Sequence, residues 1–123
     1  MIYKFTNVNP LGKLEEDCVC RAISNALQID YYKIEEKLNL VGDLFDCEKL
    51  CVCCYTFLLD YVFNLRRDES YSGMTIEEFV NYNRKGTFII RVEGHLTMCR
   101  NGCIEDIWDC RKKIVDLVWE VSR

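Results

Sequence analysis

The chain has 123 residues, of which 50% are hydrophobic and 29% are charged, and its formal net charge is −4. This length suffices for one hydrophobic core, so we expect a single domain over residues 1–123. An acidic chain without a basic block argues against a nucleic-acid partner. The absence of a long apolar run and of a secretion signal argues against a membrane partner and predicts a cytoplasmic protein.

The chain up to about residue 84 has a predominantly helical sequence pattern, with apolar residues recurring at the spacing of amphipathic helices. The predicted helices cover about residues 18–28, 31–40, 49–63 and 76–83, so that the helical part spans about 17–84. A short strand is expected before them, at residues 2–5, and a polar loop at residues 64–73. Asp17, Asp30 and Thr75 stand directly before three of these helices and are predicted to cap them.

From about residue 86 to 121 the chain is rich in β-branched and aromatic residues, which favour strands. The predicted strands lie within TFIIRV, HLTMCR, CIEDIWD and KIVDLVWEV. The dipeptide Asn101-Gly102 separates the second run from the third and is typical of a two-residue type I′ hairpin turn. We therefore predict an α+β domain in which N-terminal helices are followed by an antiparallel β-sheet.

Nine cysteines need an explanation, and their odd number without a secretion signal argues against a disulfide framework. Cys51 and Cys54 form a CxxC pair, but no second pair stands at the spacing of a zinc finger. Cys47, Cys51 and Cys54 also follow the spacing of one helix face, where free cysteine serves as a small buried hydrophobe. We expect the cysteines other than Cys18 to be mostly buried, reduced and metal-free, with a metal site or disulfides as alternatives.

The single histidine, His95, gains significance from the predicted hairpin. A two-residue turn at residues 101–102 sets a register in which Thr97 lies opposite Asp106, on the same face as His95. Asp106 is then diagonal to His95, within reach of an imidazole–carboxylate hydrogen bond, whereas Asp109 falls on the other face. The pair is compatible with catalysis and also with a structural imidazole.

Cys18 is the candidate nucleophile because it begins a predicted helix. Helix N-termini stabilise a thiolate, and their free N–H groups can bind a developing oxyanion. A cysteine at this position, with His95 as base and Asp106 as orienting carboxylate, makes a Cys-His-Asp triad. Cys20 is the competing thiol, but it lies two residues into the helix. The acidic residues 15–17 would raise the thiol pKa unless they point away.

The order of these residues resembles the papain-like superfamily, in which a helix-start cysteine is followed by a strand-opening histidine and an Asn or Asp on the next strand. Asp106-Ile107-Trp108 is similar to the Asn-Ser-Trp of papain, whose tryptophan shields the His–Asn hydrogen bond. The chain more closely resembles small phage- and prophage-encoded papain-like proteins, akin to bacteriocin leader peptidases. The matching segments read NVNP at 7–10, DCVCRAI at 17–23, KGTFII at 85–90, HLT at 95–97 and DIWDC at 106–110.

This resemblance implies a papain-like cysteine protease fold, with Cys18, His95 and Asp106 as the triad and Trp108 as its shield. Papain completes its oxyanion hole with a glutamine upstream of the cysteine, and this chain has no glutamine there. Asn7 or Asn9 is the candidate substitute, although both also suit turns.

The resulting functional hypothesis is a thiol hydrolase, a peptidase or isopeptidase acting on a protein or peptide without a metal or other cofactor. A transferase or deamidase would use the same triad. The alternative class is a non-enzymatic, phage-encoded binder or inhibitor of a host protein built on the same fold. Activation of the thiol would separate the two classes.

Overall fold

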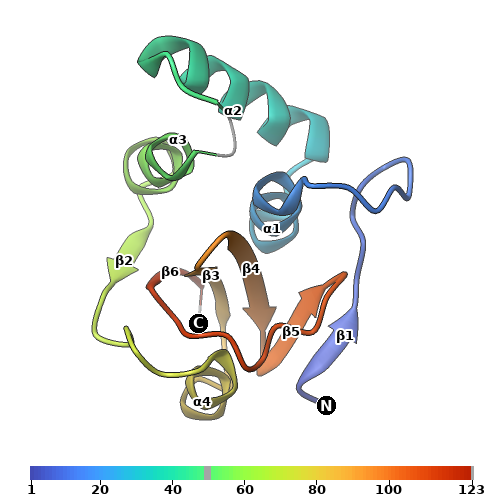
Figure 1. The fold of residues 1–123 in the computed structure, drawn as a ribbon, viewed down its shortest axis with the longest axis vertical. Helices are drawn as coiled ribbons and strands as arrows, with labels where there is room; N and C mark the ends of the chain where they lie inside the picture. The colour runs from blue at the N-terminus through green and yellow to red at the C-terminus, as the bar shows by residue number, and fades with distance from the viewer. Residues whose placement is uncertain (49–50, 123) are drawn as a thin grey trace.

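Six strands form one sheet in the computed structural model, which describes residues 1–48 and 51–122. The strands are β1 Tyr3–Phe5, β2 Arg66–Asp68, β3 Thr87–Val92, β4 His95–Arg100, β5 Cys103–Asp106 and β6 Leu117–Ser122. Their order across the sheet is β1-β5-β4-β3-β6-β2 (Figure 1). The α+β class is confirmed, but the sheet is not purely antiparallel, because β1 runs parallel to β5.

Residues 64–73 were predicted as a polar loop, and this prediction is wrong in part. β2 lies inside this segment and pairs antiparallel with β6 at the edge of the sheet. An edge strand with charged side chains lacks the apolar alternation by which a half-buried strand is recognised.

The helices are α1 Cys18–Leu27, α2 Tyr31–Phe45, α3 Val52–Phe57 and α4 Ile76–Tyr82, and α3 continues as the π-helix η1 Leu58–Val62. The predicted start of the third helix, at residues 49–50, lies outside the described part of the chain. The caps at Asp30 and Thr75 are confirmed. Asp30 accepts hydrogen bonds from the first backbone N–H groups of α2, and Thr75 forms a capping box with Glu78.

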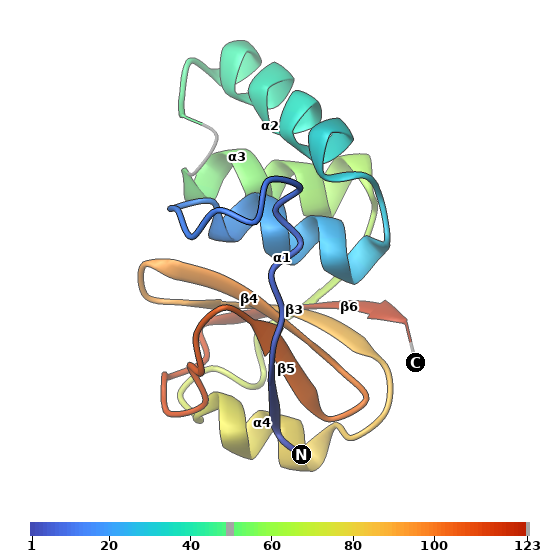
Figure 2. The ribbon, with the colours of Figure 1, turned by 90° about the vertical axis from the view of Figure 1, so that its right-hand side faces the viewer.

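The helices cover the two faces of the sheet unequally: α1, α2 and α3 lie over one face and α4 lies under the other (Figure 2). Side chains of β3 alternate between the two cores. Ile89 packs in the core with α1 and α2, whereas Phe88 and Ile90 pack in the core with α4. Because each face is apolar, both layers are held to the sheet by removal of apolar surface from water.

The predicted hairpin is confirmed in turn type and register. Asn101 and Gly102 have φ angles of 51° and 79°, as a type I′ turn requires. Arg100 pairs with Cys103, which is the register predicted for a two-residue turn. Within the described residues, no helix combines the length and apolar character that crossing a membrane requires.

Candidate active site

A pocket of about 440 Å³ opens where the N-terminus of α1, the first residues of β4 and the segment after β5 meet. Cys18, His95 and Trp108 all line it. Val52 and Tyr55 from α3 form part of another wall. The tertiary structure therefore brings the predicted nucleophile, base and shielding tryptophan to one pocket.

His95 opens β4 and Asp106 ends β5, so the hairpin carries both residues. The His95 Nε2 and Asp106 Oδ2 atoms are 2.7 Å apart, and the Asp106 carboxylate is almost fully buried. Thr97 Oγ1 donates to the same carboxylate oxygen at 2.7 Å. The other oxygen, Oδ1, accepts from the backbone N–H of Ile107 at 2.7 Å and from Arg21 Nη1 at 2.9 Å. Asp106 therefore has its two oxygens occupied by four donors.

These partners keep Asp106 ionised. Burial disfavours the charged carboxylate, but the hydrogen bonds from His95, Thr97 and Arg21 outweigh it and lower the pKa of Asp106. Burial also disfavours a charged His95 ring. Hydrogen bonds to Asp106, Cys110 and Cys18 outweigh that cost and raise the pKa of His95 to about 11.

The pKa of Cys18 shifts in the opposite direction from that of His95. Burial raises the pKa of its thiol, but the interaction with the His95 side chain, a hydrogen bond from the backbone of Leu96 and the charge of Arg21 outweigh this effect and lower the pKa. The directions of the two shifts agree with each other, because a thiolate and an imidazolium stabilise one another. The site thus favours a Cys18 thiolate beside a His95 imidazolium.

Asp17 does not cap α1 with its side chain, and that prediction is wrong. Its carboxylate instead accepts from Arg21 Nε at 2.6 Å, from Asn9 Nδ2 at 2.9 Å and from the Tyr31 hydroxyl at 2.7 Å. A buried carboxylate gains more from a guanidinium and two neutral donors than from the helix N–H groups alone. The pKa of Asp17 is lowered as a result: burial opposes the charge, and these hydrogen bonds outweigh it.

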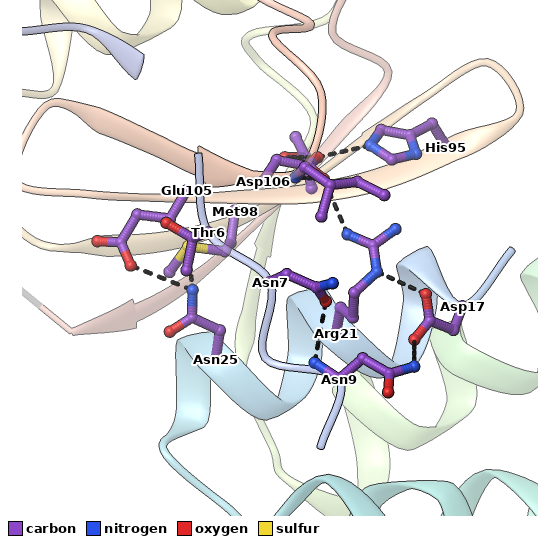
Figure 3. Close-up of polar contacts among 12 residues, drawn as sticks. Thr6, Asn7, Asn9, Asp17, Arg21, Asn25, His95, Met98, Glu105 and Asp106 are labelled. Carbon is purple, nitrogen blue, oxygen red and sulfur yellow. Dashed lines mark hydrogen bonds and ion pairs between the residues drawn. The ribbon is translucent and has the colours of Figure 1, made fainter. Parts of the chain in front are cut away.

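Arg21 joins the acidic residue before Cys18 to the carboxylate behind His95 (Figure 3). Arg21 thus forms ion pairs with two buried carboxylates from different parts of the chain. Charges alternate in sign along the row Asp17, Arg21, Asp106, His95 and Cys18. The negative charge of Asp17 is thereby neutralised next to the candidate nucleophile.

The structure does not bring Asn7 and Asn9 to the pocket as oxyanion donors. Asn7 Nδ2 donates to the backbone carbonyl of Lys13 at 3.0 Å, and Asn7 Oδ1 accepts from the backbone N–H of Asn9. Asn9 Nδ2 is divided between Glu15 and Asp17, and Asn9 Oδ1 accepts from the N–H of Leu11. Both asparagines therefore order the loop before α1, in the turn-forming role that the sequence left open (Figure 3).

Trp108 packs edge-on against His95, with ring centroids 4.9 Å apart and planes inclined by 70°. The tryptophan itself is 43% exposed, so it stands between the imidazole and solvent at the rim of the pocket. Lys113 Nζ lies 5.7 Å from the centre of the Trp108 ring, within cation–π range.

Cys110 is a site neighbour that sequence reasoning missed. It is buried, close to the His95 ring, and its thiol contributes to the raised pKa of His95. Ligand atoms of His95, Asp106 and Cys110 lie within 4.8 Å of one another. A metal there would compete with Arg21 for the carboxylate and would require a neutral imidazole, so the arrangement favours proton chemistry. The only signal for Cys110 in the sequence was its place at the end of the DIWDC segment.

Comparisons with models of protein families, with curated proteins and with solved structures gave no match for this chain. The chemistry of the site must therefore be argued from its geometry. That geometry places a helix-start thiol and an imidazole at one open pocket, with a buried carboxylate bonded to the imidazole.

Proposed function

We propose that this protein is a thiol hydrolase of the papain-like fold, with Cys18 as nucleophile, His95 as acid–base and Asp106 as the orienting carboxylate. The observation that carries the proposal is the position of His95, which shares the pocket with Cys18 and bonds to buried Asp106 through Nε2. Asp106 fixes the ring and leaves Nδ1 as the nitrogen that exchanges a proton with substrate and water.

The first half of the reaction forms a thioester. The Cys18 thiolate attacks the carbonyl carbon of an amide, a C–S bond forms, and the carbonyl π electrons move to oxygen. Collapse of the tetrahedral intermediate breaks the C–N bond, and the leaving nitrogen takes the proton of the His95 imidazolium.

The second half restores the enzyme. Neutral His95 removes a proton from a water molecule, whose oxygen attacks the thioester carbon. The C–S bond then breaks, the carboxylic acid product leaves, and Cys18 and His95 return as a thiolate–imidazolium pair. An amine that enters in place of water would make the same site a transferase.

Backbone groups supply the oxyanion stabilisation in this proposal. The N–H groups in the first turn of a helix point toward its N-terminus, and Cys18 is the first residue of α1. The asparagine side chains are engaged in the loop, so the oxyanion hole lacks the side-chain amide that papain uses. We expect a modest turnover number for that reason, because one such donor contributes a factor of about 10²–10³.

The proposed substrate is a protein or peptide, bound in the cytoplasm. The pocket is lined by the apolar side chains of Val52, Tyr55 and Trp108, by Glu15 and Glu16, and by Arg21 and Arg91, which are ion-paired to Asp106 and Asp116. Apolar walls with acidic groups at one side suit an extended peptide with a basic residue near the scissile bond. A phage origin, with a host protein as substrate, is part of the same proposal and follows from the resemblance of the motifs.

Alkylation of Cys18 by iodoacetamide tests the activation of the thiol. We expect Cys18 to react about tenfold faster than the other thiols at about pH 6, because its lowered pKa gives it a larger thiolate fraction than an ordinary thiol has. The rate at Cys18 should rise less steeply with pH than the rates at the other thiols. Peptide mapping by mass spectrometry after a time course measures the rate at each cysteine.

His95→Ala should remove the cationic partner, slow the reaction at about pH 6 and restore the steep pH dependence of an ordinary thiol. Cys103→Ser, which changes a thiol away from the pocket, is the matched control and should leave the Cys18 rate unaltered. If Cys18 reacts no faster than a free thiol and His95→Ala has no effect, the hydrolase proposal fails. A non-enzymatic protein that binds its partner at the same pocket would then be the better explanation.

A further inference from the structure

Three cysteines gather at a corner that the proposed reaction does not use. Cys47 follows the end of α2, Cys51 stands at the N-cap of α3 and Cys53 lies in its first turn. The Cys51 and Cys53 Sγ atoms are 3.0 Å apart, and those of Cys53 and Cys47 are 3.1 Å apart. All three sulfur atoms lie within 4.8 Å of one another.

The expectation of one buried helix stripe is wrong for these residues. Cys47 and Cys51 belong to the ends of two different helices, and Cys53 is exposed. Of the three cysteines in the predicted stripe, only Cys54 is buried, and its thiol donates to the carbonyl of Leu38 at 3.2 Å; Cys20, Cys99 and Cys110 are buried elsewhere, as predicted. The spacing of Cys47, Cys51 and Cys54 resembled one helix face, but the α2–α3 connection interrupts it.

Packing explains this convergence only in part, because Cys47 and Cys51 are half-buried against the core whereas Cys53 is exposed. A buried cysteine gains by removing its sulfur from water, and Cys53 does not do so. A disulfide would require a sulfur–sulfur distance of about 2.05 Å and would leave one of the three thiols unpaired. Three convergent sulfur ligands are instead the donor set that soft cations prefer.

We propose that Cys47, Cys51 and Cys53 bind one thiophilic d¹⁰ metal ion, Zn²⁺ or Cu⁺, through three thiolates. A Zn–S bond of about 2.3 Å in tetrahedral geometry separates the sulfurs by about 3.8 Å. The pairs at 3.0 and 3.1 Å would therefore open by less than about 1 Å, which the exposed Cys53 side chain permits. Each thiol releases its proton to solvent, and water completes the zinc shell on the exposed side.

Such an ion would join the end of α2 to the start of α3. Val52, which lies between two of the ligands, and Tyr55, one turn further along α3, line the pocket that contains Cys18. Metal binding to the folded state would therefore stabilise one wall of that pocket as well as the helix connection. This role is independent of any reaction at Cys18.

Titration of the fully reduced protein with each metal tests the proposal. Zinc is measured in competition with a colorimetric chelator, and Cu⁺ is measured anaerobically in competition with bicinchoninate. We expect one equivalent of one of these ions to bind and to raise the melting temperature. Cobalt(II) as a probe should show thiolate-to-metal charge-transfer absorption.

Cys53→Ser should weaken binding by at least about tenfold and remove the rise in melting temperature, since it deletes one of three ligands without touching the core. Cys103→Ser is the matched control and should bind like the parent protein. Binding of either zinc or copper that is weakened by Cys53→Ser and unchanged by Cys103→Ser would support the proposal and identify the ion.

Three results would overturn it: no binding of either ion, binding that survives Cys53→Ser, or binding that is lost in His95→Ala instead. If air-exposed protein is lighter by the mass of two hydrogens and the reduced protein binds no metal, two of the three cysteines form a disulfide instead of a metal site. None of these readouts depends on alkylation of Cys18, so this proposal and the hydrolase proposal fail separately.

Discussion

Asp106 is the residue on which the electrostatics of the candidate site depend. It is 3% exposed and accepts from Arg21, His95, Thr97 and the backbone of Ile107. A buried carboxylate with this many donors is stable as an anion; without it, protonated His95 would lose its carboxylate partner and Arg21 would keep only Asp17. Asp106 is therefore expected to contribute both to the proposed catalysis and to the stability of the fold.

Asp106→Asn should lower the free energy of unfolding by about 3 kcal/mol at neutral pH, because it leaves Arg21 and His95 without their shared anion. The matched control is Asp109→Asn, which removes the same charge from an exposed pair with Arg111. That change should cost less than about 1 kcal/mol. Chemical denaturation of the three proteins measures both differences, and equal costs for the two variants would contradict the proposed importance of Asp106.

The pH dependence of stability follows from the directions of the same pKa shifts. The raised pKa of His95 means that its ion pairs contribute fully below about pH 6.5 and are lost as the pH rises toward about 11. The lowered pKa of Asp106 means that its contribution is present above about pH 4 and is lost as the pH falls through the folded-state pKa. In Asp106→Asn, the fall in stability between neutral and alkaline pH should be smaller than in the parent protein.

The β4–β5 hairpin is the element that assembles His95, Thr97 and Asp106. Its turn forces Asn101 and Gly102 into the left-handed region, and Asn101 Oδ1 also accepts from the N–H of Gly86. A one-residue slip of the hairpin would move Asp106 to the opposite face of the sheet. Turn chemistry therefore determines the geometry of the site.

Gly102→Ala should lower the free energy of unfolding by about 1–2 kcal/mol, because a side chain disfavours a φ of +79°. Space is not the cause, since the nearest atom to an added Cβ is Arg84 Cα at 3.6 Å. Glu93→Ala in the exposed β3–β4 turn is the control and should change stability by less than about 0.5 kcal/mol. Thermal or urea unfolding measures both variants, and an unchanged stability of Gly102→Ala would argue against the type I′ turn.

The whole molecule is a sheet between two apolar layers: Cys18 belongs to one of them, whereas Cys110, next to His95, belongs to the other. Cys18 packs against the core beneath α1 and α2, whereas Phe79 of α4 lies in the core on the other face. Phe79 contacts Tyr71 and Phe88 edge-on, at centroid distances of 4.8 and 5.2 Å. Stability and thiol activation should therefore be separable by mutation.

Phe79→Leu should cost about 2 kcal/mol through lost volume and lost aromatic contacts. The alkylation rate of Cys18 and its pH profile should remain within about twofold of the parent values under conditions where the variant is fully folded. Circular dichroism melting and the labelling time course measure the two effects. A Cys18 that reverts to an ordinary thiol in Phe79→Leu would show that the two layers act together.

The sequence by itself determined the parts of this protein that depend on neighbours along the chain. The caps at Asp30 and Thr75 and the turn at Asn101-Gly102 follow from local backbone chemistry, and the turn then brought Thr97 and Asp106 together across the hairpin. Apolar periodicity likewise identified most helices and strands, because one face of each element is buried against the sheet or its covering layer.

Only the tertiary structure decided which distant groups meet. The ion pairs of Arg21, the parallel pairing of β1 with β5, the contact of Cys110 with His95 and the convergence of three thiols each join separate elements. Local spacing carries no information on such contacts, and for Asp17 it favoured a helix cap over a stronger buried guanidinium. Cys18, His95 and Trp108, which share the pocket, were singled out in the sequence, whereas the ion pairs around them and the cluster of three thiols arise from packing of the whole chain.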